Sequence, residues 1–158
     1  MNVKIWGARG SLPTPFSPTQ LEDRIARVIG KYLEPENKTK EVREFLKTLP
    51  VYERGGYGGN TPCAEVRSKQ GSQVIIDGGS GLRLLGYDLM KGPCGKGKGE
   101  IHVLMTHFHW DHLIGLPFFV PIFIPGNKIH FYGVQEDIHT FLKGLFKKPF
   151  FPVPYEAL

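Results

Sequence analysis

The sequence predicts a mixed α/β fold, because short apolar runs typical of strands alternate with segments of helical spacing. With 158 residues the chain has the usual size of one domain, and we expect residues 1–158 to form a single domain. No apolar run approaches the roughly eighteen residues that a membrane span needs, and the N-terminus does not resemble an export signal. We therefore expect a cytoplasmic protein without a membrane partner.

Five segments have the composition of β-strands. One of them, residues 74–76, is continuously apolar and β-branched, which is typical of a strand buried on both faces. It ends at Asp77 and a glycine cluster, and such strand ends often carry functional side chains. The five segments are residues 3–6, 64–67, 74–76, 101–105 and 128–132.

Helical spacing of apolar residues marks a segment between the first two strands. Ser17 and Gln20 form the pattern of a capping box, with Pro18 at the first helical position. A second helix follows and should end before Pro50. Residues 18–49 are thus expected to form a helical hairpin inserted between strands. Further helices are expected over residues 82–90, 113–119 and 136–146.

Charge and cysteine content restrict the function less than the motifs do. The formal charge of +5 suits an anionic partner, although solubility explains it equally simply and is the favoured interpretation. Cys63 and Cys94 lie far apart and lack neighbouring cysteines at metal-ligand spacing. Free thiols are favoured over a disulfide, and a cysteine zinc site is not supported.

The segment 107–112 is the strongest functional signal. His107 and His109 directly follow an apolar strand, and residues two apart project to the same side of an extended chain. Asp111 and His112 come where the chain should turn into a helix, within reach of a second ion. Imidazole and carboxylate ligands suit zinc, manganese or iron in a hydrolytic centre.

Each of these residues also has a simpler interpretation. A lone histidine is more often a structural residue, which we prefer for His102, His130 and His139. Asp111 is of a residue type that often caps a helix N-terminus, and this is the simpler interpretation. In the functional interpretation, Asp111 positions an attacking water. The four ligand-type residues together are rare by chance, so the pattern favours a metal site.

Three further residues are candidates near this segment. Asp77 ends the neighbouring strand, where it could orient a ligand histidine or the metal loop, or simply form a turn. Arg9 and Asn60 lie in glycine-rich loops, where they could contact a substrate phosphate or stabilise turns. The turn is favoured for Asn60, and both alternatives stay open for Arg9.

Residues 106–112 match the H-x-H-x-D-H signature, and the chain resembles the metallo-β-lactamase-fold superfamily. The blocks 6–11, 58–63 and 77–82, together with 115–117, resemble its ribonuclease Z-like and cyclic-phosphodiesterase branch. The resemblance implies an αββα sandwich, a two-metal site that usually holds zinc or manganese, and hydrolysis of a phosphodiester by an activated water. A cyclic nucleotide, a cyclic phosphoribosyl compound or RNA would each qualify as substrate.

By the same resemblance, His107 and His109 bind one metal, Asp111 and His112 bind the second, and Asp77 supports the loop. The family has further ligands downstream, a histidine, an aspartate and a histidine, which we do not assign to His130, Asp137 or His139. The chain is therefore expected to be the N-terminal part of such a domain.

The alternative is a non-catalytic metal-binding half-domain that assembles with a partner chain or a second copy. Nucleic acid is expected only as a substrate, because no basic motif with interleaved aromatic residues is present.

Overall fold

The computed structural model describes residues 1–55 and 58–158. The chain divides into two compact units, one formed by residues 1–13 and 60–158, the other by residues 14–59. The first unit contains the predicted strands and the segment 107–112, and the second contains the predicted helical insert. The mixed α/β class is confirmed.

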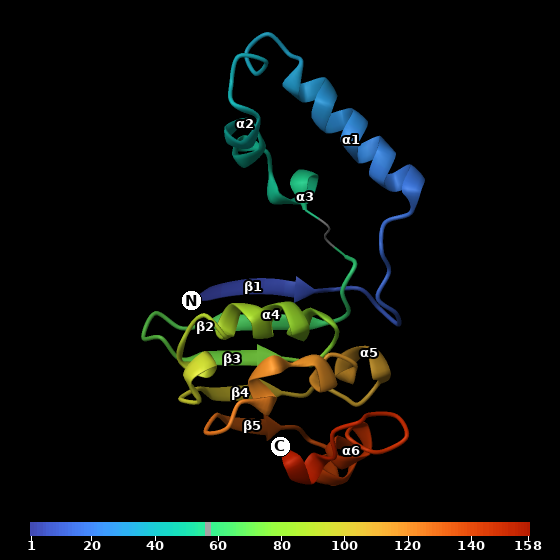
Figure 1. Cartoon of the computed structure of the whole chain (residues 1–158), viewed down its shortest axis with the longest axis vertical. Coiled ribbons are helices and arrows are strands. Elements are labelled where there is room, and N and C mark those ends of the chain that lie inside the picture. Colours follow the sequence, from blue (N-terminus) through green and yellow to red (C-terminus); the bar gives the residue numbers. More distant parts are fainter. Residues whose placement is uncertain (56–57) are drawn as a thin grey trace. The chain divides into compact units, whose positions relative to one another are not determined.

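A five-stranded mixed sheet organises the first unit (Figure 1). Its order is β1-β2-β3-β4-β5, antiparallel from β1 to β3 and parallel from β3 to β5. Each predicted strand is present, and the hairpin turn between β2 and β3 contains Gly71 in the left-handed region. The strands are β1 (Asn2–Gly7), β2 (Cys63–Arg67), β3 (Gln73–Ile76), β4 (Glu100–Leu104) and β5 (Lys128–Tyr132).

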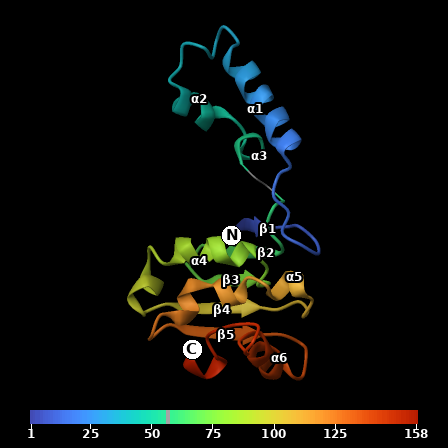
Figure 2. The ribbon, with the colours of Figure 1, turned by 45° about the vertical axis from the view of Figure 1, so that its right-hand side comes forward.

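Short helices connect the strands and pack on the sheet. The connection from β3 to β4 contains α4 (Gly81–Leu89), and the 3-10 turn η1 (Pro93–Lys96) follows it. After β4 come α5 (Trp110–Leu113), η2 (Leu116–Phe118) and η3 (Val120–Phe123). Helix α6 (Ile138–Leu145) and η4 (Tyr155–Ala157) follow β5. Figure 2, turned from the first view, also shows α4 running along the sheet and α5 at its end.

One face of the sheet forms the core of this unit. Ile75, Ile101 and Val103 are buried beneath α4 and the turns that follow α5. The apolar residues packed with them come from loops and helices and include Leu82, Leu85, Met105, Leu116 and Phe119. Cys63 and Cys94 are buried free thiols, as predicted.

The opposite face of the sheet is exposed and carries many apolar side chains. Residues paired across neighbouring strands share a face, so Ile76, Leu104 and Tyr132 lie on the same side as Val74. Val74 is 38% exposed, and the prediction that residues 74–76 are buried on both faces is therefore wrong for the described structure. The other large apolar side chains that are exposed on this face are Val3, Ile5, Leu104 and Tyr132, and the exposed charged residues Glu100 and Lys128 lie on the same face.

The described part of the second unit, residues 14–55 and 58–59, contains the helices α1 (Pro18–Tyr32), α2 (Val42–Thr48) and α3 (Val51–Arg54). The capping box is formed as predicted: Gln20 N–H donates to Ser17 Oγ, and Ser17 N–H donates to Gln20 Oε1. Lys31 pairs with Glu53 at 2.6 Å and links α1 to α3. Within the described ranges, no helix is both long and apolar enough to span a membrane.

Candidate metal centre

The segment 107–112 leaves the end of β4 and enters α5. His109 is the N-cap residue of α5, with extended φ and ψ of −69° and 151°. The alternative that made Asp111 the N-cap is therefore wrong, because Asp111 is the second residue of the helix. The helix ends at Leu113 rather than continuing to residue 119, and Pro117 and Pro121 are the second residues of two separate 3-10 turns.

The three histidines of this segment lie against one another. The ring centroids of His107 and His109 are 4.5 Å apart, and those of His107 and His112 are 3.9 Å apart. Asp111 completes the group, with Oδ2 at 3.6 Å from His112 Nε2. The extended backbone before α5 and the turn into the helix thus bring four ligand-type side chains to one place.

The first loop of the chain holds Asp111. Ser11 N–H donates to Asp111 Oδ2 at 3.0 Å, and Ser11 has a positive φ of 66°. This hydrogen bond is the main reason that the pKa of Asp111 lies below its usual value, and the nearby His112 and His109 lower it further. Asp111 is therefore a carboxylate at neutral pH, the form that accepts hydrogen bonds and binds cations.

Asp77 joins the end of β3 to the start of the histidine segment. Its Oδ1 accepts hydrogen bonds from Thr106 N–H and Thr106 Oγ, each at 2.9 Å. The residue is buried and has a φ of 62°, a conformation that aspartate tolerates better than most residues. His112 Nδ1 lies 2.9 Å from Asp77 Oδ2 but is not aligned for a hydrogen bond, so this buried nitrogen lacks such a partner among the described residues.

Glycines let the loops around the segment approach closely. Gly78 N–H donates to His112 O at 2.8 Å, and Gly115 N–H donates to Gly78 O at 2.9 Å. A Cβ atom at Gly115 would lie 2.0 Å from Gly79 O, and one at Gly79 would lie 2.5 Å from Asp111 O. The loop after β3 and the chain around α5 are therefore in backbone contact.

The structure places Asn60 in a loop contact and Arg9 at the surface. Asn60 O accepts hydrogen bonds from Ala8 N–H and Arg9 N–H, and Asn60 Oδ1 accepts one from Ser80 Oγ. The Arg9 side chain is exposed. The proposed substrate contacts of both residues stay predictions.

Sequence reasoning did not single out Ser11 and Thr106. Ser11 contributes a backbone N–H, a group that every residue except proline carries, so its side chain gives no signal. Thr106 precedes the histidines, but its bonds to Asp77 depend on the parallel pairing of β3 with β4. Both roles depend on tertiary structure.

The side chains of the segment are of types that bind divalent metals, but their donor atoms do not converge on one point in the described structure. Imidazole nitrogens and a carboxylate suit zinc, manganese or iron. In residues 1–55 and 58–158, however, no three or more His, Cys, Asp or Glu side chains converge as a metal-binding group. We therefore expect metal binding to reorient these side chains.

Comparisons of the chain with protein-family models, with curated proteins and with solved structures found no match. The family, the fold beyond its mixed α/β class and the function thus stay proposals that depend on the residues.

Proposed function

We propose that this chain belongs to a metal-dependent hydrolase that acts on phosphodiesters. The observation that carries the proposal is the contact of three imidazole rings beside the carboxylate of Asp111 at the end of β4. The carboxylate in this group is already oriented by a backbone N–H, as the carboxylate of a metal ligand needs to be. The proposed ions are two divalent metals, zinc first, with manganese or iron as alternatives.

The proposed fold is the αββα sandwich of the metallo-β-lactamase-like proteins. One layer of helices and turns covers the buried face of the sheet. The other face carries exposed apolar residues such as Val74 and Leu104, as expected of a sheet that packs on a second sheet.

The residues of the segment would have separate roles in metal binding and in activation of the water. His107, His109 and His112 hold the metals together with Asp111, and Asp77 fixes the start of the segment through Thr106. A bound divalent metal lowers the pKa of a water molecule and neutralises charge on phosphoryl oxygens. Asp111, held by Ser11, accepts a proton or a hydrogen bond from the attacking water and keeps it in line. The positive net charge of +5 favours approach of an anionic substrate.

Hydrolysis of bis(p-nitrophenyl) phosphate by zinc-loaded or manganese-loaded protein tests this function. We expect turnover that His109→Ala abolishes and that Asp111→Asn lowers by about a hundredfold or more. His139→Ala is the matched control, since His139 lies on α6 and stacks edge-on with Tyr155. Equal turnover by wild type and His109→Ala would contradict hydrolysis at these residues, whereas metal binding without any turnover would favour an incomplete half-domain.

A second candidate is a metal-binding half-domain that assembles with a partner chain or a second copy. The exposed apolar sheet face favours it, because contiguous exposed apolar surface often marks an interface. Sedimentation equilibrium tests self-assembly: Leu104→Lys on this face should abolish association, whereas Val134→Lys, at an exposed position outside the strands, should not. A wild-type monomer at all concentrations would exclude the second-copy form of this candidate.

A further inference from the structure

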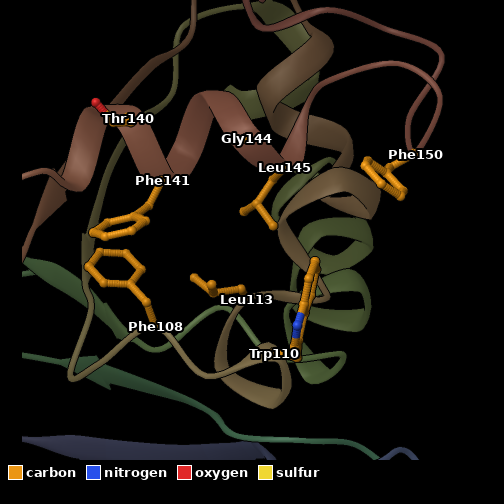
Figure 3. A pocket seen from close by; sticks show the side chains of 8 residues that line it. All are labelled: Phe108, Trp110, Leu113, Thr140, Phe141, Gly144, Leu145 and Phe150. Atoms are coloured by element: carbon orange, nitrogen blue, oxygen red, sulfur yellow. The ribbon is translucent and has the colours of Figure 1, made fainter.

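An apolar pocket lies between α5 and α6, next to the candidate metal centre. Its volume is about 500 Å³, within the range of small-molecule sites. Figure 3 shows Phe108 and Phe141 facing each other on one side, Trp110 on the other, and Leu113 and Leu145 between them. The lining residues are Phe108, Trp110, Leu113, Thr140, Phe141, Gly144, Leu145 and Phe150.

The lining specifies the chemistry of an occupant. None of the eight lining residues is charged, and Thr140 has the only polar side chain among them apart from the indole N–H of Trp110. The rings of Phe108 and Phe141 are in contact, with centroids 5.0 Å apart and planes tilted by 33°, and Trp110 is 72% exposed. Aromatic walls favour flat aromatic groups, and a lining without charge disfavours an ion, which would lose hydration without gaining a partner.

The pocket is separate from the proposed metal ligands. Phe108 alternates with His107 and His109 along the extended segment, so its side chain points to the opposite side of the backbone. A molecule in the pocket therefore contacts the back of the segment and not the imidazoles. Occupation of the pocket does not depend on metal or on phosphodiester chemistry.

We propose that this pocket is a binding site for a planar, uncharged aromatic molecule. The ligand stacks beside Trp110 and against the pair Phe108 and Phe141, and it covers Leu113 and Leu145. The inference goes beyond the proposed hydrolase function and holds whether or not that function is correct.

The test uses the uncharged fluorophore N-phenyl-1-naphthylamine with the full chain in the presence of EDTA. We expect saturable binding at one site, with quenching of Trp110 emission. The Trp6→Phe variant isolates this signal, because Trp6 and Trp110 are the two tryptophans of the chain. The anionic analogue 1-anilinonaphthalene-8-sulfonate should bind at least about tenfold more weakly, because no lining cation is present to pair with its sulfonate.

Gly144 provides a variant that fills the pocket. A Cβ atom at Gly144 meets nothing within 4 Å, and leucine is a better helix former than glycine in α6. Gly144→Leu should therefore fold and lower the affinity for the probe by at least about tenfold. Gly30→Leu is the matched control, because Gly30 is also helical, with open space around its Cβ position, but lies on α1.

Probe affinity equal to that of the wild type in Gly144→Leu would overturn the proposal, because binding would then occur elsewhere, for example on the exposed sheet face. Trp110→Ala keeps the test decisive if Gly144→Leu does not fold, since the exposed Trp110 side chain contributes little to the core. Retention of wild-type affinity in Trp110→Ala would equally overturn it.

Discussion

Asp77 connects two strand ends through a single buried carboxylate. It accepts hydrogen bonds from the N–H and the hydroxyl of Thr106 and lies beside His112, while its backbone has a φ of 62°. Replacement by alanine removes both acceptors, leaves Thr106 N–H unpaired and places a residue with poor tolerance of positive φ at this position. The residue therefore affects stability as well as the proposed site.

We predict that Asp77→Ala lowers the free energy of unfolding by about 2–4 kcal/mol. Asp77→Asn should lower it by less, because asparagine adopts the same backbone conformation and its side-chain oxygen still accepts from Thr106. Urea unfolding followed by circular dichroism measures both variants. An asparagine variant as unstable as the alanine variant would show that the negative charge, and not geometry, is what matters.

The buried thiol of Cys63 should be unreactive in the folded protein. Burial is the main cause that raises its pKa to about 12, and the charges of Asp77 and Glu65 add to the effect. The thiolate is the reactive form, so at pH 8 only about one molecule in ten thousand carries it. Burial also raises the pKa of Cys94.

We predict that dithionitrobenzoate labels neither cysteine rapidly in native protein at pH 8 and labels both in urea. The rate for Cys63 should increase as the pH rises toward 12, because the thiolate fraction increases, as long as the protein stays folded. A Cys94→Ala variant isolates the Cys63 signal. Rapid native-state labelling of that variant at pH 8 would contradict the buried placement.

At the scale of elements, close backbone contact joins the loop after β3 to the turn after α5. A Cβ atom at Gly115 would lie 2.0 Å from Gly79 O. Because Gly79 O is a backbone atom, it cannot move aside as the end of a flexible side chain can. We predict that Gly115→Ala lowers the free energy of unfolding by about 2–3 kcal/mol and disturbs the histidine segment. Gly10→Ala, with nothing within 4 Å of its Cβ position, is the matched control and should be close to neutral.

Thermal unfolding and the histidine NMR resonances measure this effect. Shifted resonances of His109 and His112 in Gly115→Ala, but not in Gly10→Ala, are the expected result. If Gly115→Ala is as stable as Gly10→Ala, the loop and α5 are not in the contact described here.

Local signals in the sequence were enough to predict several elements. The capping box of Ser17 and Gln20 is formed by residues three apart, so it depends little on the remaining fold. The strands were predictable from β-branched runs, and the burial of Ile75 and Ile101 followed from them. The placement of the histidines after β4 was predictable for the same reason.

Other features depended on tertiary structure. Val74 is as apolar as its neighbours, so the local sequence does not show that its face of the sheet is exposed. The helix after His109 was expected to continue to residue 119, whereas it ends at Leu113 and is followed by two 3-10 turns that contain Pro117 and Pro121. The hydrogen bond from Ser11 to Asp111 spans a hundred positions, which no local pattern records.

At the scale of the whole molecule, the chain combines a sheet unit that carries the proposed site with a helical unit of residues 14–59. The site depends on loops at one end of the sheet, where β3 is followed by Asp77 and β4 by the histidine segment (Figure 1). In mixed and parallel sheets, neighbouring parallel strands end on the same side, which explains why residues thirty positions apart meet. The sheet unit alone thus contains the groups needed to test the central proposal.

Zinc binding by the purified chain tests that proposal most directly. Elemental analysis after zinc loading and exhaustive dialysis should give about one equivalent or more of zinc for the wild type and for His139→Ala. The His109→Ala variant should lose at least half of it, because His109 lies in the contact group of imidazoles. A wild type that retains no more zinc than His109→Ala would contradict a metal centre at residues 107–112.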